Sequence, residues 1–170
     1  MRVRAAVPED AEAIAAIHVR AWQVAYADVF PAERLAGLDA RGRARWWREG
    51  LETGDWSVLV TEDVTGFVGF GPSREAEGEG EIYSIYVAPE RWGTGRGRVL
   101  MERALEELRA QGFAAATLWV LEDNPRARRF YEAAGWELDG AAKADEFLGT
   151  VVYEVRYRIS LRRRTGGSTR

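Results

Sequence analysis

The chain has 170 residues, 46% of them hydrophobic, and a formal net charge of −3, a composition that is ordinary for one soluble domain with a substantial core. Cysteine is absent, which excludes disulfides, thiolate metal sites and a covalent acyl-cysteine intermediate. The acidic balance argues against nucleic-acid binding, and no apolar run is long enough to cross a membrane, so we expect a cytoplasmic protein.

The first half of the sequence predicts a strand, two helices and three more strands. Residues 2–7 are expected to form the opening strand. Apolar residues then recur at helical spacing around His18, the only histidine. It could relay protons near neutral pH, but its place on this apolar stripe favours a packed, hydrogen-bonded role. A second helical stretch follows over 31–50. The three strands cover 56–61, 66–71 and 81–87.

The second half alternates helices with strands. A helix is predicted over 96–111, and the apolar run at 115–121 is typical of a central strand. A short helix is expected after Asn124, and apolar and charged residues alternate over 151–160, which predicts a half-buried strand. The order of elements is β-αα-βββ-α-β-α-ββ, which includes one further strand between the short helix and 151–160.

The chain contains no internal linker, so we expect a single domain over 1–161. Beyond it, an arginine run followed by Thr-Gly-Gly-Ser-Thr is typical of a basic, disordered tail, which we assign to 162–170.

Three glycines at alternate positions join the strand 81–87 to the helix 96–111: Gly93, Gly95 and Gly97. Glycine lets the backbone approach a ligand closely, and the first N–H groups of a helix lack partners, so this junction is suited to binding phosphate. A P-loop is excluded because Arg98 and Val99 stand where it needs Lys and Ser or Thr. The dinucleotide pattern G-x-G-x-x-G fits less well, because position 98 is arginine, and stays open as an alternative.

The short helix after residue 124 has clear end signals. Asn124 is a good N-cap, Pro125 suits the first helical position and Gly135 suits the residue past the end. One face of the helix is apolar and carries the phenol of Tyr131. On the pattern alone, this tyrosine is expected to pack.

These two segments, together with Ile-Tyr-Val-Ala-Pro-Glu at 85–90, resemble the GNAT superfamily of acyl-CoA-dependent N-acyltransferases. The resemblance implies an α+β fold with a central mixed, mostly antiparallel sheet of six to seven strands. About four helices flank this sheet, which is splayed between its fourth and fifth strands. One position departs from the family: Trp92 stands where Gln or Arg is usual, which is expected to change side-chain contacts with the pyrophosphate more than binding itself.

The resemblance also implies acetyl-CoA as the co-substrate, without a metal. The residues expected to bind it lie at the strand end, in the glycine loop and at the helix starts: Ile85, Tyr86, Val87, Trp92, Gly93, Thr94, Gly95, Arg96, Gly97, Arg98, Asn124, Ala127 and Tyr131.

Catalytic roles follow from the same resemblance. Tyr131 occupies the family's position for the general acid that protonates the departing thiolate. Glu81 opens the strand where the family commonly places the general base, which is needed because an alkylammonium group has a pKa of about 10.4. A backbone N–H near Val87, where the family has a bulge, is expected to polarise the thioester carbonyl. Neighbouring glutamates are expected to form an acidic rim that attracts cationic acceptors: Glu75, Glu77 and Glu79.

For the acceptor, the resemblance implies a pocket walled by the first two helices and the late strands. It offers Trp22, Tyr26 and Tyr83, with Trp46 or Trp47 as further candidates. Aromatic walls suit an amine flanked by apolar groups and can stabilise a cation. The acceptor is expected to be a small-molecule or peptide amine, and the protein a monomer or homodimer.

Two other classes of function remain open at this point. A non-catalytic acyl-CoA-binding sensor would use the same loop without turnover, although the presence of Glu81 and Tyr131 argues against it. A small nucleotide- or NAD-binding protein would also use the loop, but it gives no reason for the helix that follows Asn124.

Overall fold

The computed structural model describes residues 1–162, and the predicted tail from residue 163 onward lies outside the described residues. Within the described part, the helices are α1 (Ala11–Ala25), α2 (Ala32–Ala36), α3 (Ala40–Thr53), α4 (Arg96–Ala110) and α5 (Pro125–Ala133). The strands are β1 (Val3–Ala5), β2 (Ser57–Thr61), β3 (Gly66–Pro72), β4 (Gly80–Val87), β5 (Ala115–Leu121), β6 (Glu137–Phe147) and β7 (Thr150–Ser160).

The predicted order of elements is confirmed with one difference, which is that the helical stretch 31–50 is two helices. Gly37 ends α2, and the Asp39 side chain then accepts a hydrogen bond of 3.0 Å from the N–H of Gly42. This N-cap starts α3 as a separate helix, because it satisfies one of the backbone donors that a helix start leaves free.

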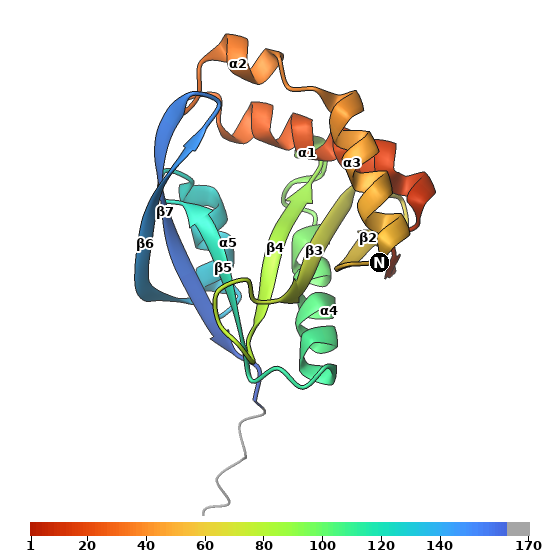
Figure 1. The fold of residues 1–170 in the computed structure, drawn as a ribbon, viewed down its shortest axis with the longest axis vertical. Coiled ribbons are helices and arrows are strands. Elements are labelled where there is room, and N and C mark those ends of the chain that lie inside the picture. Colours follow the sequence, from red (N-terminus) through yellow and green to blue (C-terminus); the bar gives the residue numbers. More distant parts are fainter. Residues whose placement is uncertain (163–170) are drawn as a thin grey trace, which may run out of the picture.

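The strands form one mixed sheet in the order β1-β2-β3-β4-β5-β7-β6. Every neighbouring pair is antiparallel except β4 and β5, which are parallel and pair only at Gly80 with Ala116 and Glu81 with Thr117. Beyond these pairs the two strands diverge, with α1 and α2 across the open end (Figure 1). The predicted splay between the fourth and fifth strands is therefore confirmed.

Apolar clusters on both faces of the sheet hold the helices in place. On one face α4 packs through Leu100 and Leu108, and on the other α1 and α3 pack through Ile14 and Trp47. A third group, the bridging cluster, connects α1 and α2 to β5 and β7 across the open end: Tyr26, Phe30, Leu35, Leu121 and Val152. Each fully buried large apolar side chain contributes about 1.5–3 kcal/mol, so this cluster ties the two halves of the splayed sheet together. No helix among residues 1–162 has the length and apolar character needed to span a membrane.

Strand β4 carries one residue more than β3 along their pairing. The register shifts between Gly69 and Phe70, which leaves Tyr83 without a partner as a bulge. The bulge was expected near Val87, and the structure corrects that position. A Cβ on Gly71 would lie 2.7 Å from the Tyr83 hydroxyl, so glycine at that position leaves the room that the bulged tyrosine needs.

Candidate active site

A cleft of about 1870 Å³ opens where β4 and β5 diverge. At one end, the loop end, it is lined by residues 91–98 and 123–127. At the other, the aromatic end, it is lined by side chains of α1, α3 and the strands β4 to β7. Every residue predicted to bind acetyl-CoA or the acceptor lines this cleft, and so does Tyr131, whereas Glu81 does not.

The three loop glycines have different structural roles. Gly93 and Gly95 have φ of 74° and 83°, a left-handed conformation that favours glycine, and nothing lies within 4 Å of where a Cβ would be. Gly95 is also the N-cap of α4, where no side chain caps the helix, so its first N–H groups are free to bind an anion. By contrast, a Cβ on Gly97 would lie 3.3 Å from the Phe130 ring. Glycine at position 97 therefore leaves the space that lets α4 and α5 pack closely.

Four arginines line the loop end, and two of them are already paired. Arg96 donates to Asp63 at 2.6 Å, and Arg98 donates to Glu102 at 2.8 Å. Arg126 instead stacks on Trp92, with its guanidinium carbon 3.6 Å from the ring centroid. Among the described residues this guanidinium has no hydrogen bond or ion pair, and burial lowers its pKa. Arg126 was not predicted as a site residue, and the signal for it was its place in the first turn of the helix that starts at Pro125.

The edge of β4 that faces β5 offers backbone donors to the cleft. The N–H of Ala88 donates to the Thr65 carbonyl on the β3 side at 2.8 Å. Successive N–H groups of a strand point to opposite edges, so those of Val87 and Ile85 point toward the splay, where β5 is out of reach. The Val87 carbonyl is capped by the Trp92 indole N–H at 2.9 Å. Trp92, the departure from the family pattern, thus links the glycine loop to the strand end.

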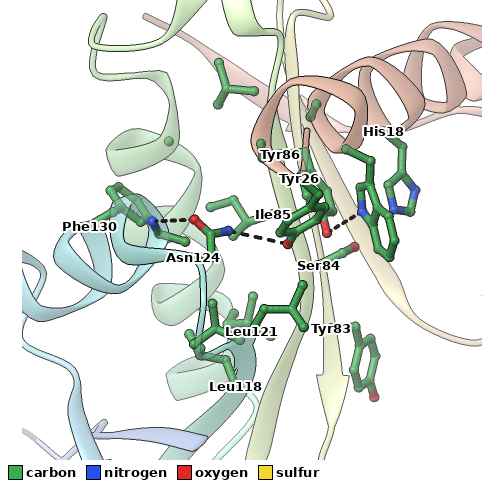
Figure 2. A pocket seen from close by; sticks show the side chains of 18 of the residues that line it. His18, Tyr26, Tyr83, Ser84, Ile85, Tyr86, Leu118, Leu121, Asn124 and Phe130 are labelled. Carbon is green, nitrogen blue, oxygen red and sulfur yellow. Dashed lines mark hydrogen bonds between the residues drawn. The ribbon is translucent and has the colours of Figure 1, made fainter. Parts of the chain in front are cut away.

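Hydrogen bonds connect predicted coenzyme residues with predicted acceptor residues (Figure 2). Asn124 caps α5 by accepting from the N–H of Ala127 at 3.1 Å, and its amide also donates to the Tyr26 hydroxyl at 3.4 Å. The Tyr86 hydroxyl accepts from the Trp22 indole at 2.8 Å. Tyr86 was predicted on the coenzyme side, but its hydroxyl lies against α1.

Burial controls the protonation of the titratable rings in the cleft. Tyr131 is 8% exposed, and burial raises its pKa well above the usual value of a phenol, so it keeps its proton at neutral pH. His18 stacks on Tyr86 with 4.7 Å between ring centroids, and burial lowers its pKa to about 3. The predicted packing of His18 is therefore confirmed and its ring is neutral, but the predicted hydrogen bonding is not seen at Nδ1, which is buried without a partner among the described residues.

The predicted base, Glu81, is buried and forms an ion pair with Arg74. Glu81 is 1% exposed, and one carboxylate oxygen accepts from Arg74 at 2.7 Å, while the Arg74 side chain is 66% exposed and lines the cleft. The expected acidic rim is largely neutralised as well. Glu75 pairs with Arg156 at 3.0 Å and Glu79 pairs with Arg158 at 2.7 Å, which ties the loop between β3 and β4 to β7.

The aromatic end contains three side chains that the sequence did not single out. Trp119, Lys143 and Glu154 come from the neighbouring strands β5, β6 and β7, and all of them line the cleft. Lys143 and Glu154 are paired residues of the β6–β7 hairpin, whereas Trp119 is brought beside them only by the order of strands in the sheet.

Comparison with known proteins agrees with this geometry. The sequence model of the acetyltransferase (GNAT) family matches residues 12–136. The chain is 38% identical to YuaI, an uncharacterised N-acetyltransferase of Bacillus subtilis, over 77% of each chain. It is 30% identical to the L-amino acid N-acyltransferase MnaT of Escherichia coli, over 80% of this chain and 79% of MnaT. YncA of Salmonella typhimurium, solved with acetyl-CoA, shares the fold with a TM-score of 0.71 and 25% identity, over 95% of this chain and 94% of YncA. The chain belongs to the GNAT family and is an acetyltransferase.

Proposed function

We propose that this protein transfers the acetyl group of acetyl-CoA directly to a primary amine while both substrates are bound in the cleft. The observation that carries the proposal is the splay itself, because it brings a free strand edge, an uncapped helix start and the buried Tyr131 to one cleft. The acetyl-CoA seen with YncA supports the co-substrate, and the name of MnaT supports a small-molecule amine as acceptor.

The residues present fit acetyl-CoA. The free N–H groups at the start of α4 would hold the pyrophosphate, and Arg126 would supply positive charge that no acidic side chain among residues 1–162 neutralises. The N–H groups of Ile85 and Val87 would bind the pantetheine arm and polarise the thioester carbonyl.

In the reaction, the amine nitrogen attacks the thioester carbonyl, the C–N bond forms and the C–S bond breaks. Tyr131 gives its proton to the thiolate. Burial raises the pKa of this phenol, and the same lack of water raises the pKa of a thiol leaving beside it, so proton transfer stays feasible. Glu81 is the proposed base, and it would receive the amine proton through water, since Arg74 covers it.

The function is tested by incubating the protein with acetyl-CoA and a panel of primary amines that includes L-amino acids, and measuring released thiol. We expect release that depends on the amine, and a melting temperature that rises with acetyl-CoA according to RT ln(1 + [L]/Kd). If acetyl-CoA raised the melting temperature but no amine released thiol, the sensor alternative would be favoured.

A further inference from the structure

The single lysine of this chain places its ammonium group in the cleft. Lys143 Nζ lies 3.7 Å from a carboxylate oxygen of Glu154 and 4.2 Å from the ring centroid of Trp119. A carboxylate and the face of an indole are two groups that attract an alkylammonium cation, by charge and by the ring quadrupole. The structure therefore shows a primary ammonium group bound in the cleft of an enzyme that acetylates amines.

The position of Glu154 relates this arrangement to the reaction. Side chains of a strand alternate between faces, so Glu154 shares a face with Val152, which packs in the bridging cluster with Tyr26. Burial, and more weakly the Glu154 carboxylate, raises the pKa of Tyr26. The Tyr26 hydroxyl in turn accepts from Asn124 at the loop end. Glu154 also pairs across the strands with Leu121, another member of the bridging cluster, so it lies at the aromatic end beside the cluster that contains Tyr26.

Glu154 also differs from an ordinary surface ion-pair partner. Its side chain is 13% exposed, whereas the surface pair Arg98–Glu102 has side chains 78% and 58% exposed. Burial raises the pKa of Glu154, while Lys143 lowers it. A carboxylate that is mostly withdrawn from water needs a cation beside it. Because Lys143 and Glu154 both line the cleft, a ligand's cation can take the place of the Lys143 ammonium group.

We propose that Glu154 and the face of Trp119 form the binding site for the ammonium group of the acceptor, and that Lys143 fills this ammonium site until an acceptor displaces it. The inference rests on the proposed acetyl transfer and deepens it, because it assigns the residues that bind the ammonium group of the acceptor. Glu154 binds and orients the acceptor, and the nitrogen loses a proton through water to Glu81, the proposed base, before it attacks the thioester.

Binding at the ammonium site can be tested without knowing the acceptor. Lys143→Ala removes three methylene groups and the ammonium group, which together correspond to propylammonium. Propylammonium chloride should raise the melting temperature of this variant saturably, and sodium chloride at the same concentration should not. The effect should be absent in Lys143→Ala/Glu154→Gln and retained in Lys143→Ala/Glu146→Gln, because Glu146 is exposed on β6 and does not line the cleft. An equal rise in the Glu154→Gln and Glu146→Gln double variants would overturn the ammonium site.

A second experiment tests whether the ammonium site serves catalysis, using an acceptor identified with the amine panel. Glu154→Gln should raise its KM about tenfold or more, because a hydrogen bond to a charged group is lost, and should leave the Kd of acetyl-CoA unchanged. Lys143→Met keeps the contact with Trp119 without the charge, so it should lower the KM a few-fold, roughly the size of an exposed ion pair. An unchanged KM in Glu154→Gln would refute the ammonium site and leave acetyl transfer intact. Propylammonium binding without acetylation of any amine would refute acetyl transfer and leave the site intact.

Discussion

The chemical role of Tyr131 must be separated from its packing role, because its side chain belongs to the core and also lines the cleft. Tyr131→Phe keeps the ring and removes the proton. We expect kcat to fall roughly 10²-fold, within the usual range for general acid catalysis, with an unchanged Kd for acetyl-CoA by calorimetry. Tyr153→Phe, at a position 61% exposed, is the control and should change neither. Matching losses of coenzyme affinity and thermal stability in Tyr131→Phe would instead assign it a packing role.

Arg126 offers a second test at this scale, because it is the stacked and unpaired cation of the loop end. Arg126→Gln should weaken acetyl-CoA binding about tenfold or more, as expected for loss of a charge-assisted hydrogen bond. Binding of acetyl-pantetheine, which lacks the phosphates, should not change. Arg98→Gln should have a smaller effect, because Glu102 already neutralises that guanidinium. If both coenzyme forms lost the same affinity in Arg126→Gln, a phosphate contact would be the wrong explanation.

At the scale of elements, α4 and α5 approach each other at Gly97. Gly97→Val should lower the free energy of unfolding by about 1–3 kcal/mol, because the added methyl groups press on Phe130 and Val87. Gly97→Ala adds only the Cβ, 3.3 Å from the Phe130 ring and 3.8 Å from Val87, and should cost less than valine. Urea unfolding measures both, and a valine variant with an unchanged midpoint would show that α5 does not depend on this position.

The order of elements could be predicted because it depends on local signals. The strand predicted at 115–121 has the bounds of β5, since a continuous apolar run is typical of a strand buried on both faces. The break between α2 and α3 was missed because apolar residues occur on both sides of it, and only Gly37 and the cap at Asp39 mark the end of one helix and the start of the next.

For the site, residues that are close in sequence could be predicted, and residues that meet only in the folded sheet could not. The glycine loop and the segment from Asn124 to Tyr131 are continuous in sequence, so their pattern predicted which residues line the cleft. The ammonium site could not be predicted as a whole, because Trp119 on β5 reaches the hairpin pair Lys143 and Glu154 only through the β5-β7-β6 order. Whether a carboxylate such as Glu81 is open or covered by Arg74 likewise depends on tertiary packing.

For the molecule as a whole, two residue pairs join β4 to β5, and the bridging cluster makes the contact across the open end. The amides of Ile85 and Val87 point toward the splayed side, where β4 and β5 pair only at Gly80 and Glu81. Those of Tyr86 and Ala88 face β3, where Ala88 donates to Thr65. Neighbouring amides of one strand are therefore expected to exchange their hydrogen for deuterium at alternating rates, fast at Ile85 and Val87 and slow at Tyr86 and Ala88. Saturating acetyl-CoA should slow the fast pair specifically, as read residue by residue by NMR, and equal protection along β4 would mean that the coenzyme stabilises the whole strand without bonding to its open edge.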